Sequence, residues 1–392
     1  MKKIAYFSIG IPDPSQGGSG IINYYILKEL INKNYLVDAF FLSNNNFLSN
    51  HASSFFFDKI KNKLNNFHFI DVKQKKNKKL NFFYNHLKDV HNVKLCEEYI
   101  KKINTNYDTY ISLDLGWAIA LKKKNNVLSI LGDPYHSRII HGHNESILKK
   151  IKAISTSLKF VVKKIGKDLN GKNKVVVNFS KNHVDEYCSK GLYCKHLNYF
   201  STFYSYNKIK KKFNSKGPFI ITHLGDLSTT ASRKNVDFLR KSLKVLSEKI
   251  NRKIILFFIG RYAGNKNLFL NYKNIKIKYM GHIKDLDKKL IKSDAVISVA
   301  DYPVGTRTRL LNAMSLGVPC IAHISSSLGL HQLKDREDIL FCRNVNEFVK
   351  NVILLSSDIN LQKKLSRNAR KTWNENFNPK INVQKILDKI NC

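Results

Sequence analysis

Short apolar runs of strand length alternate along the chain with longer stretches of helical periodicity. This alternation is typical of βαβ units, in which a helix connects two parallel strands of one sheet. The predicted strands of the first half are residues 4–9, 36–42, 67–72, 109–113, 127–131 and 175–179. Those of the second half are residues 219–224, 253–259, 275–280, 295–299 and 319–322. The pattern therefore predicts the α/β fold class, with helices such as residues 20–32 and 146–164 between the strands.

The length of the chain favours two domains. Its 392 residues exceed the ~250–300 residues at which a single hydrophobic core usually stops growing. A basic segment, residues 204–216, precedes Gly217 and Pro218 and separates the two series of strands, as a linker would. We therefore expect one domain over residues 1–205 and a second over residues 217–378.

The net charge of +39 is the most unusual feature of the composition. It fits a polyanionic partner, such as nucleic acid, an anionic membrane surface or phosphorylated substrates. The chain is also rich in residues with A/T-rich codons, so genome composition is an equally good explanation. No stretch approaches the ~20 apolar residues of a membrane-spanning helix, and the six cysteines are scattered. We expect a cytoplasmic protein with reduced thiols.

Two glycine-containing turns are candidate phosphate-binding sites. Gly17, Gly18, Ser19 and Gly20 follow the first predicted strand and open a helical stretch. Glycines let a backbone approach a ligand closely, and a helix start favours an anion. A plain strand-to-helix turn explains the same residues. In the second half, a similar turn opens a helix with residues Gly305, Thr306, Arg307 and Arg309.

Two more cations precede another predicted helix. Arg233 and Lys234 stand just before residues 236–246, shortly after a strand end. Ligands of doubly wound sheets bind outside the carboxyl ends of the strands. Cations beside a helix start at that edge suit a diphosphate, although surface lysines and arginines are also common.

Several short motifs of the second half resemble those of a known enzyme family. They are Phe258-Ile259-Gly260, Tyr279-Met280-Gly281, Ser293-Asp294-Ala295, Asn312-Ala313-Met314, Gly317-Val318-Pro319 and the helix of residues 369–377. They resemble the C-terminal half of GT-B glycosyltransferases of group 1, a retaining family with a Glu-Ala helix. The resemblance covers residues 219–377 and is looser before them.

This resemblance implies two Rossmann-like domains facing each other across a cleft, with the final helix, residues 379–392, crossing back to the first domain. It implies transfer of a sugar, as in hexosyltransferases, from a nucleotide diphosphate sugar to a hydroxyl acceptor. A cell-surface glycan or a lipid-linked saccharide is the acceptor class it favours, which belongs to polysaccharide biosynthesis. The donor diphosphate would lie against Arg233, Lys234, Gly305, Thr306, Arg307 and Arg309.

Two positions depart from the family pattern. Many members carry two glutamates eight positions apart, which contact the donor sugar and the ribose. Here those positions are Val304 and Asn312. The Asn312 amide can still hydrogen-bond a nucleotide ribose, whereas Val304 offers no polar atom. The sugar and the stereochemical outcome therefore remain open.

The acceptor hydroxyl would need a general base. Asp114, Asp133 and His136 follow predicted strands of the first half and are the catalytic candidates. Asp133 could equally cap a turn, and His136 could be an ordinary loop histidine. No residues show the spacing of metal ligands, so we expect no metal and no cofactor besides the nucleotide-sugar substrate.

Residues 149–174 combine lysines with a helical pattern of apolar residues. Such a basic amphipathic helix can lie on an anionic membrane, and it can equally be a domain helix packed on its own sheet. Two other functions remain open beside the enzyme. One is an inactive GT-B-like binding protein, because of Val304 and Asn312. The other, supported only by charge, is a nucleic-acid-binding protein.

Overall fold

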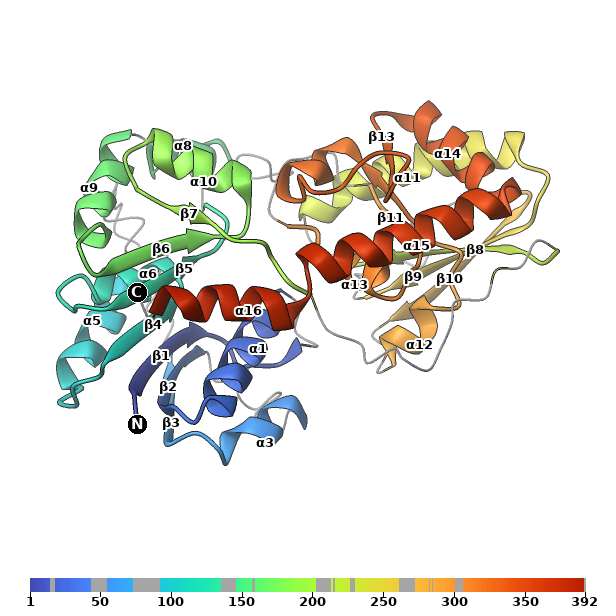
Figure 1. Cartoon of the computed structure of the whole chain (residues 1–392). Coiled ribbons are helices and arrows are strands. Elements are labelled where there is room, and N and C mark those ends of the chain that lie inside the picture. Colours follow the sequence, from blue (N-terminus) through green and yellow to red (C-terminus); the bar gives the residue numbers. More distant parts are fainter. Residues whose placement is uncertain are drawn as a thin grey trace. The chain divides into compact units, whose positions relative to one another are not determined.

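The computed structural model describes residues 1–14, 18–43, 55–72, 92–134, 146–156, 159–201, 213, 216–225, 230–260, 272–281, 283, 285–299 and 306–390. These residues form two compact units (Figure 1). The first takes in the described residues of 1–200 together with those of 379–390. The second takes in the described residues of 201–378. None of the described helices is long and apolar enough to cross a membrane.

Within the described residues, the first unit is built on a seven-stranded parallel sheet in the order β3-β2-β1-β4-β5-β6-β7. Apart from the short last strand, this is the strand order of a Rossmann fold. Its strands are β1 (Lys3–Ile9), β2 (Leu36–Ser43), β3 (Asn66–Asp71), β4 (Thr109–Leu113), β5 (Val127–Leu131), β6 (Lys174–Asn178) and β7 (Lys195–His196).

Helices connect these strands, and several of them bury apolar residues in two core clusters with the sheet. They are α1 (Gly18–Asn32), α3 (Phe55–Lys61), α5 (Val93–Lys102), α6 (Leu115–Ala120), α8 (Ile147–Thr156), α9 (Lys159–Leu169) and α10 (Lys181–Ser189). The C-terminal helix α16 (Pro379–Leu387) and the short η3 (Asp388–Ile390) also belong to this unit, and α16 packs against α1. The last helix of the chain therefore completes the first unit.

The second unit has a six-stranded parallel sheet within the described residues, in the order β10-β9-β8-β11-β12-β13. Its strands are β8 (Phe219–Leu224), β9 (Ile254–Ile259), β10 (Ile275–Gly281), β11 (Ala295–Ser298), β12 (Cys320–His323) and β13 (Leu340–Cys342). Its helices are α11 (Thr230–Lys249), α12 (Leu286–Leu290), α13 (Thr308–Ser315), η2 (Ile324–Gly329), α14 (Val345–Ser357) and α15 (Ile359–Asn376).

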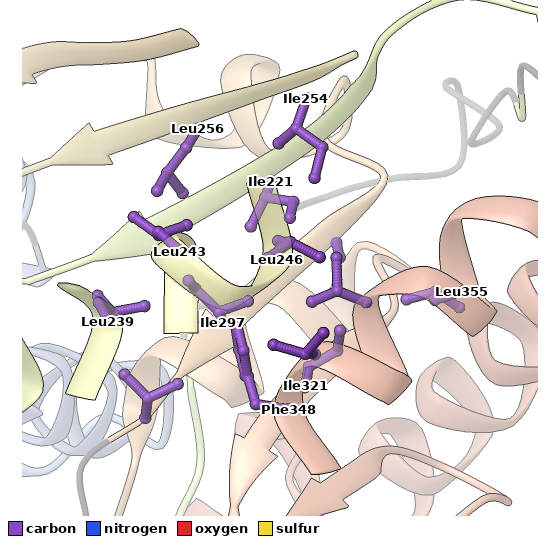
Figure 2. Packing of buried hydrophobic residues seen from close by; sticks show 14 of the residues in the cluster. Ile221, Leu239, Leu243, Leu246, Ile254, Leu256, Ile297, Ile321, Phe348 and Leu355 are labelled. Atoms are coloured by element: carbon purple, nitrogen blue, oxygen red, sulfur yellow. The ribbon is translucent and has the colours of Figure 1, made fainter. Parts of the chain in front are cut away.

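One face of this second sheet forms the core of the unit. Figure 2 shows Ile221, Ile254 and Ile297 of the strands packing against Leu243 of α11 and Phe348 of α14. Alternate residues of a strand point to the same face. This regular packing holds the carboxyl ends of β8, β9 and β11 at a common edge.

The fold class expected from the sequence is confirmed, with two Rossmann-like units of parallel strands. The sequence did not predict two strands, β7 and β13, because two or three residues are too few to show the alternation of a strand. Of the helix predicted over residues 146–164, the structure describes α8, which ends at Thr156, and α9, which starts at Lys159 and continues to Leu169; residues 157–158 lie outside the described residues. Most of the expected linker, residues 204–216, lies outside the described residues.

Candidate functional site

Two glycines meet at the carboxyl edge of the second sheet. Gly225 follows β8 with φ of 138°, and Gly260 follows β9 with φ of 132°. A Cβ atom on Gly260 would lie 2.3 Å from the Gly225 carbonyl oxygen. The Gly225 N–H donates to the Ile259 carbonyl at 3.0 Å, which holds the two turns together. A side chain on Gly260 would collide with the Gly225 backbone, so the two turns pack directly against each other.

The Arg309 guanidinium lies against Gly225. A Cβ atom on Gly225 would stand 2.8 Å from Arg309 Nη1 and 3.0 Å from its Cζ. Arg309 belongs to the first turn of α13, which packs against β11. The glycine therefore leaves room for a guanidinium at the strand edge, where a ligand of this fold binds.

His223 lies on β8 just before this turn. It is buried, its ring packs on Phe258 with centroids 5.3 Å apart, and neither ring nitrogen has a hydrogen-bond partner among the described residues. Burial and then the Arg309 charge lower its pKa from 6.5 to about 3. The ring is therefore neutral at pH 7 and adds no positive charge beside Arg309.

The start of α13 contributes more polar groups. The Thr306 hydroxyl donates to the Gly329 carbonyl at 3.5 Å, and Arg307 occupies the N-cap position without capping the helix by its side chain. Asn312, one turn further, has a buried Oδ1 that accepts no hydrogen bond from the described residues. Gly305, also expected here, lies outside the described residues.

Arg233 and Lys234 stand elsewhere than expected in their helix. α11 starts at Thr230, so both lie within its first turns, whereas the sequence placed them before the helix. The expected start at residue 236 was wrong because the apolar periodicity begins only at Val236, after a polar first turn. Both remain near the N-terminal end of a helix that follows β8.

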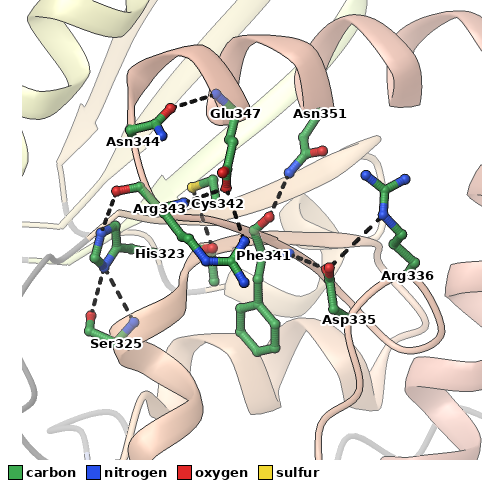
Figure 3. Close-up of polar contacts among 11 residues, drawn as sticks. His323, Ser325, Asp335, Arg336, Phe341, Cys342, Arg343, Asn344, Glu347 and Asn351 are labelled. Atoms are coloured by element: carbon green, nitrogen blue, oxygen red, sulfur yellow. Dashed lines mark hydrogen bonds and ion pairs between the residues drawn. The ribbon is translucent and has the colours of Figure 1, made fainter.

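Other polar groups at this edge serve the fold. Figure 3 shows His323, at the end of β12, between Ser325 and Arg343. Its Nδ1 accepts from the Ser325 N–H at 3.3 Å, and its Nε2 lies 3.2 Å from the Arg343 carbonyl oxygen. This pairing fixes a proton on Nε2. The His323 ring thus ties β12 to β13.

In the first unit, Asp114 follows β4 and caps α6. Its carboxylate accepts from the Gly116 N–H at 2.6 Å, and its backbone is extended as an N-cap requires. The structure thus gives Asp114 a structural role at the carboxyl edge of the first sheet. A catalytic role for Asp114 stays a prediction.

Asp133 follows β5 at the same edge and is partly exposed. Its Oδ1 lies 3.4 Å from Nδ1 of His183, which α10 holds in a buried position. The His183 ring therefore lies directly behind the Asp133 carboxylate, at ion-pair distance. His136, the third candidate, lies outside the described residues.

The Gly17–Gly20 turn is described from Gly18 onward. Gly18 starts α1, Ser19 is exposed and Gly20 is buried. The Tyr199 hydroxyl donates to the Gly18 carbonyl at 2.9 Å. Tyr199 therefore anchors the start of α1 at the carboxyl edge. Gly17 lies outside the described residues.

Comparison with known proteins identifies the second unit. Residues 205–372 match the family model for glycosyl transferases group 1. This match covers less than half of the chain, and it supports a glycosyltransferase with a group 1 domain in the second unit. No curated protein sequence matched the chain.

Solved structures share the fold over the whole chain. HepE from Anabaena, in complex with UDP and glucose, is 12% identical with a TM-score of 0.64, over 99% of this chain and 99% of that one. A glycosyltransferase from Rickettsia africae is 17% identical with a TM-score of 0.67, and the match covers 99% of this chain and 97% of that one. WaaG, a glycosyltransferase involved in lipopolysaccharide biosynthesis, is 13% identical with a TM-score of 0.63, and the match covers 98% of this chain and 99% of that one. At these identities the likeness establishes the GT-B fold.

Sequence reasoning missed two histidines of this glycosyltransferase. His223 sits inside an apolar strand, and the alternation of β8 could have revealed it as a polar residue on a buried face. His183 gave no local signal, because its partner Asp133 comes from a separate strand. Within the described ranges, no three His, Cys, Asp or Glu side chains gather as metal ligands would. Metal independence stays a prediction.

Proposed function

We propose that this glycosyltransferase moves a hexosyl group from a nucleotide diphosphate sugar to an acceptor hydroxyl without a metal ion. One observation carries the proposal. The Arg309 guanidinium is held against Gly225 at the carboxyl edge of the second sheet. HepE, which has the same fold, binds UDP and glucose. A UDP-sugar is therefore the first donor to test.

The leaving diphosphate gains negative charge as the glycosidic bond breaks. Arg309 and Arg307, with the Thr306 hydroxyl, would bind that charge at the start of α13, together with Gly305. Arg233 and Lys234, near the start of α11, would add further cations. Fixed cations and helix N–H groups lower the barrier because they bind the diphosphate more tightly in the transition state.

Asn312 is the proposed ribose ligand. Its buried Oδ1 accepts no hydrogen bond from the described residues, and a ribose hydroxyl is a donor of matching chemistry. Leaving such an acceptor unsatisfied costs ~1–3 kcal/mol, which a bound ribose would recover. Val304, which lies outside the described residues, offers the donor sugar only an apolar contact.

In the acceptor domain, Asp133 is the better-placed base. It is partly exposed at the carboxyl edge and is backed by His183, whereas Asp114 caps α6. His136 stays a second candidate, and the turn of Gly17, Gly18, Ser19 and Gly20 would border the acceptor or donor. The proposed acceptor is a lipid-linked saccharide or a cell-surface glycan. WaaG, involved in lipopolysaccharide biosynthesis, has the same fold.

The proposed location is the cytoplasm, with peripheral contact to the inner face of the membrane. Five cysteines, Cys96, Cys188, Cys194, Cys320 and Cys342, are free thiols, as expected of a reducing compartment. Nucleotide sugar and acceptor are the proposed partners, and no cofactor is proposed.

The test is a pair of arginine variants. We expect Arg309→Ala and Arg307→Ala each to lose ~30- to 1000-fold in transfer rate, since one such contact supplies ~2–4 kcal/mol in the transition state. Arg343→Ala, an exposed arginine of the same unit, is the matched control and should keep the parent rate. If folded Arg309→Ala and Arg307→Ala transfer sugar at the parent rate, the diphosphate lies elsewhere.

A nucleotide-sugar panel tests the donor directly. A donor at 100 times its dissociation constant should stabilise the fold by ~2.7 kcal/mol. Stabilisation by one nucleotide base and not by others identifies the donor. If no nucleotide sugar stabilises the chain and no transfer occurs, the enzymatic proposal fails in favour of a binding protein.

A further inference from the structure

The exposed face of α8 is apolar, which is the reverse of what a surface helix normally shows. Ile147 is 79% exposed, Leu148 55%, Ile151 54% and Ile154 50%. The positions 147, 151 and 154 lie on one face of a helix. Among the side chains of this helix whose burial the structure describes, Ala153 alone is buried. The apolar stripe of α8, defined by these four exposed residues, therefore faces away from the core.

The neighbouring helix α9 shows that this exposure is not a general feature of the segment. Val161, Val162, Ile165 and Leu169 of α9 are buried in a core cluster of the first unit. The domain-helix interpretation of residues 149–174 thus describes α9, whereas the large apolar side chains of α8 are exposed. Figure 1 shows the two helices following each other at the same corner of the first unit.

The charge of the two helices is almost entirely positive. α8 contains three lysines and α9 contains four, against one aspartate, Asp168. Lys149 is exposed beside the apolar stripe, and Lys163, Lys164 and Lys167 are exposed on α9. An apolar stripe flanked by lysines matches an anionic lipid surface, with apolar tails below and phosphate groups at the level of the cations.

The topology places α8 toward the edge that carries Asp133. α9 returns the chain to Lys174, the first residue of β6, at the amino edge of the sheet. α9 therefore begins toward the carboxyl edge, and α8 precedes it. An acceptor held in a membrane beneath α8 would be on the side of the sheet where β5 ends.

We propose that the apolar stripe of α8 inserts into the interface of an anionic membrane and that the lysines of α8 and α9 bind its phosphate groups. This inference rests on one part of the proposed function, the lipid-linked or cell-surface class of the acceptor. A second copy of the chain is the less suitable occupant, because two molecules of net charge +39 repel each other.

The first experiment measures sedimentation with phosphatidylcholine vesicles, with and without phosphatidylglycerol. We expect the full chain to bind only the anionic vesicles, and less at high salt. Ile147→Asp/Ile151→Asp should weaken the partitioning by about tenfold or more. Lys149→Gln/Lys150→Gln should weaken it by about fivefold for each lysine. Ile381→Asp, at an exposed isoleucine of α16 (40%) in the same unit, is the matched control and should bind like the parent.

A second experiment detects insertion of α8 directly and does not depend on a variant that weakens binding. Ile151→Trp should show a blue shift of its fluorescence with anionic vesicles, whereas Ile381→Trp should show none. Equal binding to neutral and anionic vesicles would overturn the proposal. So would an unshifted Ile151→Trp spectrum while the chain is bound, or a dimer in solution that Ile147→Asp/Ile151→Asp dissolves.

Donor-induced thermal stabilisation separates this inference from the proposed function. The α8 variants should keep it unchanged, because the proposed donor site lies in the second unit. If nucleotide sugars stabilise the chain but vesicles do not bind, only the membrane inference fails. If vesicles bind and no nucleotide sugar does, only the proposed function fails.

Discussion

Gly260 has a backbone conformation that residues other than glycine rarely adopt, and neighbouring atoms fill the space that a Cβ atom would need. With φ of 132° and the Gly225 carbonyl oxygen 2.3 Å from a Cβ position, Gly260→Ala should lower the free energy of unfolding by at least ~1 kcal/mol. Urea denaturation measures the change. Gly132→Ala is the matched control, since nothing lies within 4 Å of its Cβ position. Equal stability of the two variants would contradict this packing.

His223 should make the fold sensitive to acid. Its pKa falls from 6.5 to about 3 in the folded chain, mainly through burial. Below pH 6.5 the unfolded chain binds a proton that the folded chain does not bind until about pH 3. Stability from this residue is therefore present above pH 6.5 and is lost as the pH falls, by about 1.4 kcal/mol per pH unit within that window.

His223→Phe removes this titration while keeping an aromatic ring beside Phe258. Its free energy of unfolding should fall less steeply than that of the parent between pH 6 and pH 4. Urea denaturation at several pH values gives both slopes. Identical slopes would show that the histidine does not titrate differently in the two states.

At the scale of elements, α14 depends on a reciprocal cap. Asn344 Oδ1 accepts from the Glu347 N–H at 2.9 Å, and Glu347 Oε2 accepts from the Arg343 N–H at 2.8 Å (Figure 3). Asn344→Ala should cost ~1 kcal/mol of stability, with a lower Tm. Asp285→Ala is the control, because Asp285 precedes α12 without capping it by its side chain. A Tm unchanged by Asn344→Ala would contradict the capping role.

At the scale of the whole molecule, the net charge of +39 opposes compactness. Raising the ionic strength from ~0.01 M to ~0.15 M shortens the Debye length from ~30 Å to ~8 Å. We therefore expect the Tm to rise with salt, equally for sodium and potassium chloride. Thermal denaturation across a salt series measures it. A falling Tm would show that attractive charge pairs outweigh the repulsion.

Local pattern in the sequence was enough to predict most of the fold. β4, β5 and β8 have the bounds that their apolar runs indicated, because each run records which residues face a core. The sequence could not reveal that α8 turns its apolar stripe outward, because periodicity shows that a face is apolar and not what covers it.

The sequence by itself determined the two parallel α/β sheets and the family of the second unit. It also placed the basic turn of Arg307 and Arg309 at a strand edge. Only the tertiary structure set Arg309 against Gly225, His223 behind it, and His183 beside Asp133. These pairs join residues from different strands and helices. Their contact depends on strand order and on the space that a glycine leaves. The local sequence pattern does not determine either of these.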